Sequence, residues 1–230
     1  MKRYADASLR KRASFSLPRL FVLFLILLLA SCSGLHQRLP DGGRAWAIEP
    51  LPETVRKEMA ACSWRPGCPV GPENLVLLHV LYLGFDKETH PGELVVDKDV
   101  AAELRDIFRE LYESRFPIRR IARIEHYNGS DDASMAADNT SAFNCRPVTG
   151  GTGFSRHSFG RAVDLNPVEN PFVKSGTVLP AQGAAYTDRD RPAEGMIQKG
   201  DACWQAFVSR GWEWGGDWNT LKDYQHFQKK

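Results

Sequence analysis

Residues 75–85 read LVLLHVLYLGF, and this apolar run decides the fold class. It is rich in Leu and Val, which predicts a buried β-strand. Residues 92–96, GELVV, predict a second short strand close behind it. Two apolar strands so near each other in sequence indicate a sheet at the centre of the domain.

A helix is expected next, from about residue 100 to residue 115. Its apolar side chains recur at helical spacing, and they are Leu104, Ile107, Phe108 and Leu111. Asp97 or Asp99 is expected to cap its start, and Phe116-Pro117 to end it.

Shorter patterns fill the remainder of the chain. Helices are expected at 52–61 and 201–209, and strands at 118–126, 161–165 and within 212–228. Two turn-rich stretches, 128–154 and 166–195, predict long loops, and loops of that length are usually functional. The order predicts one α+β domain with a central antiparallel sheet flanked by helices.

The first 32 residues are typical of an export signal. Basic residues precede the unbroken apolar run 20–30, LFVLFLILLLA. Eleven residues rise about 16 Å as a helix, too little to span a bilayer of about 30 Å. Leu29-Ala30-Ser31-Cys32 resembles the bacterial lipobox, which predicts a lipid on Cys32. A plain signal peptide or a membrane anchor with an incidental Cys is the alternative.

This N-terminal pattern predicts a location and a domain division. A lipidated Cys32 implies an exported lipoprotein of the bacterial cell envelope that faces the periplasm, and Ser33 suits the outer membrane. The polar, Gly-containing residues 33–50 are interpreted as a tether, which leaves residues 51–230 as the functional domain.

The charge of the chain excludes one class of partner. The formal net charge is +2, but residues 1–32 carry six Lys/Arg and a single acid, so the remainder has a net charge of −3. Nucleic-acid binding is therefore not expected.

Four cysteines remain besides Cys32, an even number in an oxidising compartment, so disulfides are expected. Cys62 and Cys68 are expected to close a short loop. Cys145 is expected to join Cys203.

Two segments carry the residues of a chemical site. The first is 155–164, SRHSFGRAVD; the second joins 214–218, WGGDW, to 223–227, DYQHF. A catalytic zinc ion takes three protein ligands from His and Asp or Glu and leaves one position for water. His157, Asp164 and His226 fit the ligand roles. Asp223 fits the base that takes the proton of the water.

The pattern S-x-H-x-x-G-x-A-x-D with a later acid-x-x-H resembles the zinc D-alanyl-D-alanine carboxypeptidase family. That family includes vancomycin-resistance dipeptidases and carboxypeptidases and phage L-alanyl-D-glutamate endolysins. Residues 134–146, 157–171 and 214–227 are most similar to the endolysin-like branch. The resemblance spans about Leu75 to Gln228.

The resemblance implies Zn²⁺ on His157, Asp164 and His226, with Asp223 as the catalytic acid. It also implies that Arg146 stabilises the scissile carbonyl as that group gains negative charge. Many members have Glu where this chain has Asp223, and the shorter side chain must lie closer to the water. Peptidoglycan stem peptides are then the expected substrate, cut next to a D-amino acid by a monomeric enzyme.

Two alternatives remain open. The first is a catalytically silent lipoprotein that binds the cell wall and keeps the peptidase fold. The second is a zinc peptidase that acts on ordinary L-peptides, because the shape of the pocket decides the stereochemistry. The sequence also leaves open whether the enzyme is a carboxypeptidase or an endopeptidase.

Overall fold

The computed structural model describes residues 43–148 and 151–230. The predicted signal segment, the lipidation site Cys32 and most of the predicted tether lie outside this range. The last residues of that tether form strand β1 (Ile48–Pro50), so the folded domain begins earlier than expected. None of the helices in the described ranges is both long and apolar enough to cross a membrane.

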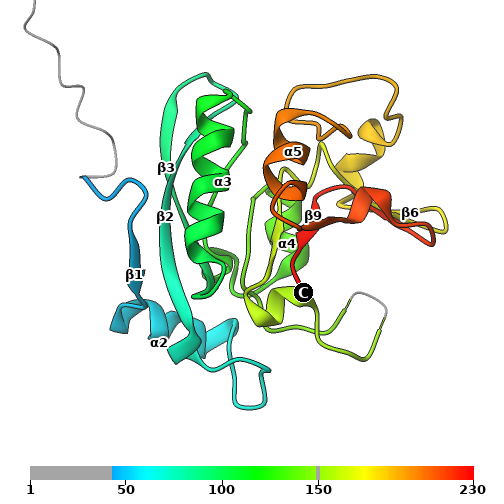
Figure 1. The fold of residues 1–230 in the computed structure, drawn as a ribbon. Coiled ribbons are helices and arrows are strands. Elements are labelled where there is room, and N and C mark those ends of the chain that lie inside the picture. The colour runs from blue at the N-terminus through cyan, green and yellow to red at the C-terminus, as the bar shows by residue number, and fades with distance from the viewer. Residues whose placement is uncertain (1–42, 149–150) are drawn as a thin grey trace, which may run out of the picture. The chain divides into compact units, whose positions relative to one another are not determined.

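The first sheet is built on the apolar run that decides the fold class. Strand β2 (Leu75–Leu83) pairs antiparallel with β1 and with β3 (Thr89–Asp97), and the order is β1-β2-β3. Helix α3 (Ala101–Glu113) lies along one face of this hairpin (Figure 1). The expected strands and helix are therefore confirmed.

Alternation along the strands divides the core between the two faces of the sheet. Leu78 and Leu94 are register partners and pack with Leu104 and Phe108 of α3. On the opposite face, Leu75, Leu77 and Val95 pack with Val55 and Met59 of helix α2 (Glu53–Cys62). The hairpin is therefore apolar on both faces, which explains its nearly continuous run of buried residues.

The start of α3 differs from the expectation. Val100 is the N-cap residue, and no side chain caps the helix. The carboxylate of Asp97 accepts a hydrogen bond from the backbone N–H of Asp99, at 2.9 Å, instead.

The C-terminal half contains two further small antiparallel sheets, not an extension of the first. One has the order β4 (Ala162–Asp164), β9 (His226–Gln228) and β7 (Glu213–Trp214). The other has the order β6 (Thr177–Leu179), β5 (Phe172–Lys174) and β8 (Lys222–Asp223). The α+β class is confirmed, with three sheets where one central sheet was expected.

Helix α5 (Ala202–Val208) joins the halves through a shared core. The ring of Phe207 on α5 stacks on Phe227 of β9 at 4.1 Å between centroids. Both rings belong to the same buried cluster as the residues beneath α3. The sheet that carries β9 is thereby fixed to the first layer of the domain.

The expected strand at 118–126 is wrong. Ile121 makes only an isolated bridge to Thr140, and a 3₁₀ helix, η2 (Ile124–Tyr127), follows. Side-chain amides take the place of a β-ladder here: Asn166 Oδ1 accepts from the N–H of Arg119 at 3.0 Å. Asn139 Oδ1 likewise accepts from the N–H of Ala122 at 2.9 Å.

The two expected loops contain ordered elements. The stretch 128–154 includes helix α4 (Asp131–Ala136), which Ser130 caps by accepting from the N–H of Ala133. The stretch 166–195 includes the β5–β6 hairpin and the 3₁₀ helix η4 (Ala181–Tyr186).

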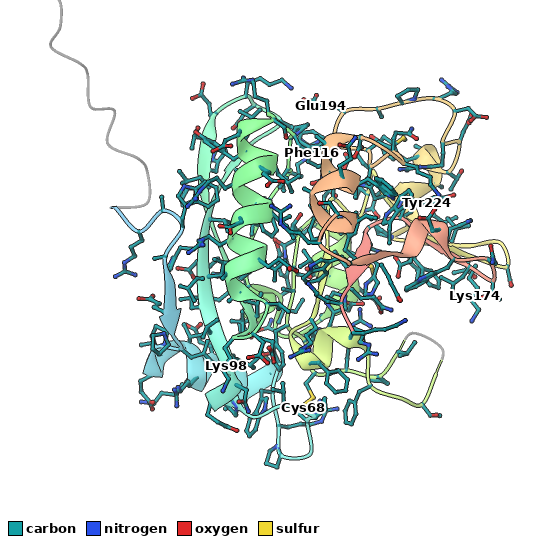
Figure 2. All side chains as sticks on the ribbon, in the orientation of Figure 1. Cys68, Lys98, Phe116, Lys174, Glu194 and Tyr224 are labelled. Atoms are coloured by element: carbon teal, nitrogen blue, oxygen red, sulfur yellow. A yellow bond between two sulfur atoms is a disulfide. The ribbon has the colours of Figure 1, made fainter. Side chains whose placement is uncertain are left out.

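The disulfide pairing also differs from the expectation. Cys68 is bonded to Cys145, with Cα atoms 6.0 Å apart (Figure 2). Cys62 and Cys203 are free. Cys203 is buried on α5 in the core cluster beneath α3, whereas its expected partner, Cys145, belongs to the cluster around α2. Cys145 instead lies beside the C-terminal end of α2, where its backbone N–H donates to the carbonyl of Ser63, the residue that caps this helix, at 3.0 Å.

Candidate metal centre and substrate cleft

The pairing of β4 with β9 places two of the expected ligands side by side. Asp164 and His226 are register partners in that antiparallel pair. His157 comes from the 3₁₀ helix η3 (Arg156–Phe159), where the hydroxyl of Ser155 accepts from its backbone N–H at 3.3 Å. Three separate segments therefore deliver one side chain each to the same point.

Gly160 allows the chain to turn between His157 and Asp164. Its φ of 68° lies in the left-handed region, and an added Cβ would meet the backbone nitrogen of Asp97 at 2.5 Å. Both the conformation and the close approach favour glycine.

The three side chains converge on one buried point. His157 Nε2 lies 3.0 Å from Asp164 Oδ2, and His226 Nδ1 lies 2.9 Å from Asp164 Oδ1. The two ring nitrogens are themselves 3.2 Å apart. In the described ranges, no other group of three His, Cys or acidic side chains brings its possible ligand atoms within 4.8 Å of one another.

Hydrogen bonds on the far side of each ring fix its orientation. His157 Nδ1–H donates to the carbonyl of Ala142, which leaves Nε2 to face Asp164. His226 Nε2–H donates to Gln228 Oε1 at 3.2 Å, which leaves Nδ1 to face Asp164. Ligand histidines in metal sites are held in this way. Two imidazole nitrogens and one carboxylate form the donor set of a catalytic zinc site, so the residues present fit that metal.

His157, Asp164 and His226 form a cluster of ionisable side chains that is buried away from solvent. Burial alone would raise the pKa of Asp164, but the neighbouring His157 and His226 outweigh it and hold the pKa well below its usual range. Burial lowers the pKa of His226, yet the hydrogen bond and charge of Asp164 raise it to about 8. A carboxylate that stays ionised beside two imidazoles suits a cation.

Asp223 stands beside this group on β8. Burial raises its pKa to about 6, with His226 opposing the shift and Asp164 adding to it. Its Oδ1 atom is buried and has no hydrogen-bond partner among the described residues. Gly215 permits this placement, because a Cβ there would meet the carbonyl oxygen of Asp223 at 2.5 Å.

Arg146 reaches the site from the segment next to the disulfide. Its Nη2 donates to Asp131 Oδ2 at 3.0 Å, while its Nε is buried without a partner in the described part of the chain. The hydroxyl of Ser158 accepts from the backbone N–H of Arg146 at 2.9 Å and so ties this segment to η3. Nη1 donates to the carbonyl of Pro147 at 3.4 Å, so Nε–H is the donor of this guanidinium that is left without a partner among the described residues.

A cleft of about 260 Å³ opens at the metal centre. Arg146, Asp223 and His226 line it together with Trp218, whose ring lies 5.4 Å from the His226 ring. Phe154 stands exposed at its edge. Three of the five expected site residues thus line one binding surface, and the other two, His157 and Asp164, lie against His226.

Neighbouring residues of the same C-terminal stretch lie outside the centre. Trp212 and Trp214 belong to the buried core. Asp217 pairs with Lys199 at 3.0 Å on the surface, where it orients no ligand of the centre.

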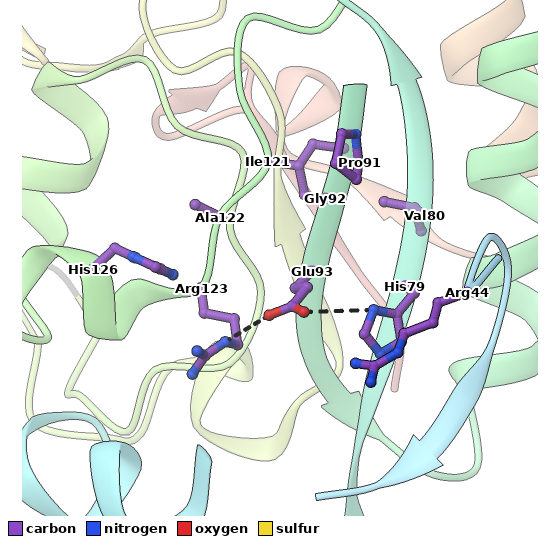
Figure 3. A pocket seen from close by; sticks show the side chains of 10 residues that line it. All are labelled: Arg44, His79, Val80, Pro91, Gly92, Glu93, Ile121, Ala122, Arg123 and His126. Atoms are coloured by element: carbon purple, nitrogen blue, oxygen red, sulfur yellow. Dashed lines mark hydrogen bonds and ion pairs between the residues drawn. The ribbon is translucent and has the colours of Figure 1, made fainter. Parts of the chain in front are cut away.

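A larger hollow, of about 610 Å³, is lined by residues of β2, β3 and the segment that leads into η2 (Figure 3). Three ionisable groups on its wall are paired with one another: Arg123 with Glu93 at 3.1 Å, and Glu93 with His79 at 3.5 Å. The group that could hold a metal borders the smaller cleft and not this hollow, so the smaller cleft is the candidate active site.

Sequence reasoning missed three residues that the structure places at the centre. Gln228 orients His226, Asp131 holds Arg146, and Gln225 is buried beside Asp164 and Asp223. Gln225 and Gln228 flank His226 in sequence, and that nearness was the available signal. Asp131 lies in the stretch expected to be a loop, and no sequence signal pointed to it.

Comparison with known proteins supports the same class. Residues 149–229, just over a third of the chain, match the family described as D-alanyl-D-alanine carboxypeptidase. The match contains His157, Asp164, Asp223 and His226, and it confirms the resemblance over this region. No curated protein and no solved structure matches the chain. The family match supports a hydrolase, a peptidase of the D-alanyl-D-alanine carboxypeptidase kind.

Proposed function

We propose that this chain is a zinc-dependent peptidase that cuts peptidoglycan stem peptides next to a D-amino acid. The observation that carries the proposal is the convergence of His157, Asp164 and His226 beside an unpartnered carboxylate oxygen of Asp223. A buried carboxylate without a partner is costly, so it is expected to serve a substrate or a water.

His157, Asp164 and His226 would hold a zinc ion, which would lower the pKa of a water in the cleft. The free oxygen of Asp223 would accept a proton from the attacking water and pass it to the leaving amine. The 100-fold to 10,000-fold contribution typical of such proton transfer is about 3–5 kcal/mol of barrier.

Arg146 acts on the other side of the scissile bond. Its unpartnered Nε–H donates to the carbonyl oxygen as negative charge develops there, while Asp131 holds the guanidinium in place. A donor that is already oriented needs no reorganisation during the reaction.

The proposal extends to the location of the enzyme. A lipid on Cys32 would hold the domain at a membrane of the bacterial envelope, within reach of the cell wall. The negative charge of the chain beyond residue 32 gives no reason to expect nucleic acid as a partner.

Purified muropeptides test the proposal. The zinc-loaded protein should release fragments whose masses identify the bond, either a terminal D-alanine or an internal peptide. If it cleaves no muropeptide at all, the silent wall-binding lipoprotein replaces the peptidase.

A further inference from the structure

The cleft carries a second arginine that the proposed mechanism does not use. Four ionisable side chains line the cleft, and they are Arg146, Arg156, Asp223 and His226. Three of them already have a part: His226 as a ligand, Asp223 in proton transfer and Arg146 at the scissile carbonyl. Arg156 is left without one.

The guanidinium of Arg156 is half-buried and unpaired. In the described ranges it makes no hydrogen bond or ion pair, and its Cζ atom lies 5.7 Å from the centroid of the Phe159 ring. Glu213 lies within electrostatic range of Arg156, but its two oxygens are already held by Lys230 at 2.8 Å and by Gln228 at 3.1 Å. The cleft wall therefore presents a positive charge whose donors are unused.

The backbone of η3 holds Arg156 next to the metal centre. Arg156 directly precedes the expected ligand His157, and its carbonyl accepts from the N–H of Arg161 at 3.3 Å. The hydroxyl of Ser155 accepts from the N–H of His157 at 3.3 Å on the other side. A substrate group that binds this guanidinium is therefore close to the scissile bond.

The surroundings of Arg156 in the cleft suit an anion. The apolar side chains of Phe154, Phe172, Trp218 and Leu221 line the same cleft. Apolar walls limit the water around a bound charge and so strengthen its attraction to the guanidinium. The planar guanidinium also matches the two oxygens of a carboxylate.

We infer that Arg156 binds the free α-carboxylate of the leaving residue, the residue whose amine is released when the peptide bond is cut. The inference rests on the proposed peptidase function and names the group by which that site recognises its substrate. Arg146 then donates to the scissile carbonyl, and Arg156 donates to the carboxylate on the amine side of the bond.

The two substrates that the proposed function leaves open carry this carboxylate at the same place. In a terminal D-alanine the carboxylate is attached to the carbon that bears the scissile nitrogen. In a D-glutamate that is joined onward through its side chain, the free α-carboxylate is attached to the equivalent carbon. One guanidinium therefore serves either substrate, whereas the interior of an ordinary α-linked peptide has no free carboxylate at this position.

Paired substrates test the inference. Each pair differs only in a carboxylate or a carboxamide on the leaving residue, one pair with a terminal D-alanine and the other with a side-chain-linked D-glutamate. In whichever pair is cut, we expect the carboxylate form to have a kcat/KM at least about 10-fold higher, the usual effect of a hydrogen bond between charged groups. The ratio should fall as salt is added, because the guanidinium is only half-buried.

Arg156→Gln removes the charge and should bring the ratio of carboxylate to carboxamide close to one. Arg156→Lys keeps the charge without the planar fork and should restore part of the ratio. Arg191→Gln, at an exposed position outside the cleft, is the matched control and should keep the unmutated ratio. Zinc content and thermal unfolding establish that the variants are folded, and a ratio between two substrates reports recognition and not a general loss of stability.

Calorimetric binding of the same peptides separates the inference from the proposed function. Equal cleavage of both members of each pair, or a preference that Arg156→Gln leaves unchanged, would overturn the inference and leave the peptidase intact. An absence of cleavage with tighter, Arg156-dependent binding of the carboxylate peptide would overturn the peptidase and retain the carboxylate site. An absence of both cleavage and binding would overturn both. Where the inference holds, the pair in which the carboxamide is cut more slowly identifies the source of the carboxylate, a terminal D-alanine or an internal D-glutamate.

Discussion

Gln228 Oε1 lies 3.2 Å from His226 Nε2 and accepts a hydrogen bond from its N–H, so that His226 presents Nδ1 to Asp164. Gln228 is in turn held by Glu213, whose carboxylate accepts from its Nε2 at 3.1 Å. The orientation of one expected metal ligand therefore depends on a residue two positions further along the same strand.

Gln228→Leu should weaken zinc binding about 10-fold to 100-fold, the usual effect of losing such a supporting hydrogen bond. Competition with a coloured chelator measures the affinity. Gln228→Glu keeps an acceptor at the same place and should retain more of it. A leucine variant that binds zinc as tightly as the unmutated protein would show that Gln228 does not position His226.

The Cys68–Cys145 disulfide joins the segment after α2 to the residue before Arg146. Replacing both cysteines with serine should lower the free energy of unfolding by about 2–4 kcal/mol, which denaturant titration measures. Peptide mapping without reductant should find this link in exported protein, with free thiols at Cys62 and Cys203. A Cys62–Cys68 or Cys145–Cys203 peptide would contradict the structure.

Glu169 predicts a dependence of stability on pH. Burial raises its pKa from 4.5 to about 8, and Asp138 adds to the shift. Glu169 ionises at a lower pH in the unfolded chain than in the folded protein. Its contribution to the free energy of unfolding is therefore fully present below about pH 4.5 and is lost as the pH rises to about 8. The slope is at most about 1.4 kcal/mol per pH unit.

Glu169→Gln should remove this fall and gain stability relative to the unmutated protein between pH 5 and pH 8. Glu113→Gln, an exposed position on α3, is the control and should leave the pH dependence unchanged. A difference between Glu169→Gln and the unmutated protein that stays constant with pH would refute the role of Glu169.

Anchoring remains a prediction from the sequence. The Cys32→Ala protein should no longer incorporate labelled fatty acid and should leave the lipoprotein fraction. Serine at the neighbouring position 31 is the control, since Ser31→Ala keeps a small residue before the cysteine. Unchanged acylation of Cys32→Ala would refute the lipobox.

The predictions that were confirmed concern elements whose hydrophobic pattern or residue spacing lies within one short segment of the sequence. The apolar run of β2 and the helical spacing of Leu104, Ile107 and Leu111 each describe a buried face directly. The spacing from His157 to Asp164 likewise follows from one short turn and one strand. These features require no knowledge of distant contacts.

The predictions that failed concern features that depend on contacts between residues distant in sequence. Residues 118–126 have the composition of a strand, but the side chains of Asn166 and Asn139 accept from the backbone N–H groups at positions 119 and 122. Cys145 pairs with Cys68 because the chain returns to the end of α2, and no spacing shows this. Gln225 and Gln228 have no signature apart from their nearness to His226, because any polar residue would look the same there.

The most direct test of the central claim compares Asp223→Asn with Asp164→Asn in two measurements on the same samples, zinc by elemental analysis and the rate of muropeptide cleavage. Asp223→Asn should keep about one zinc ion per chain and the fold, yet lose about 100-fold to 10,000-fold in rate, because the amide cannot take the proton of the water. Asp164→Asn should lose zinc together with activity, as should His157→Ala and His226→Ala, because a neutral amide is a poor zinc ligand. An Asp223→Asn protein that lacks zinc or turns over at a near-normal rate, or ligand variants that retain full zinc, would contradict the account.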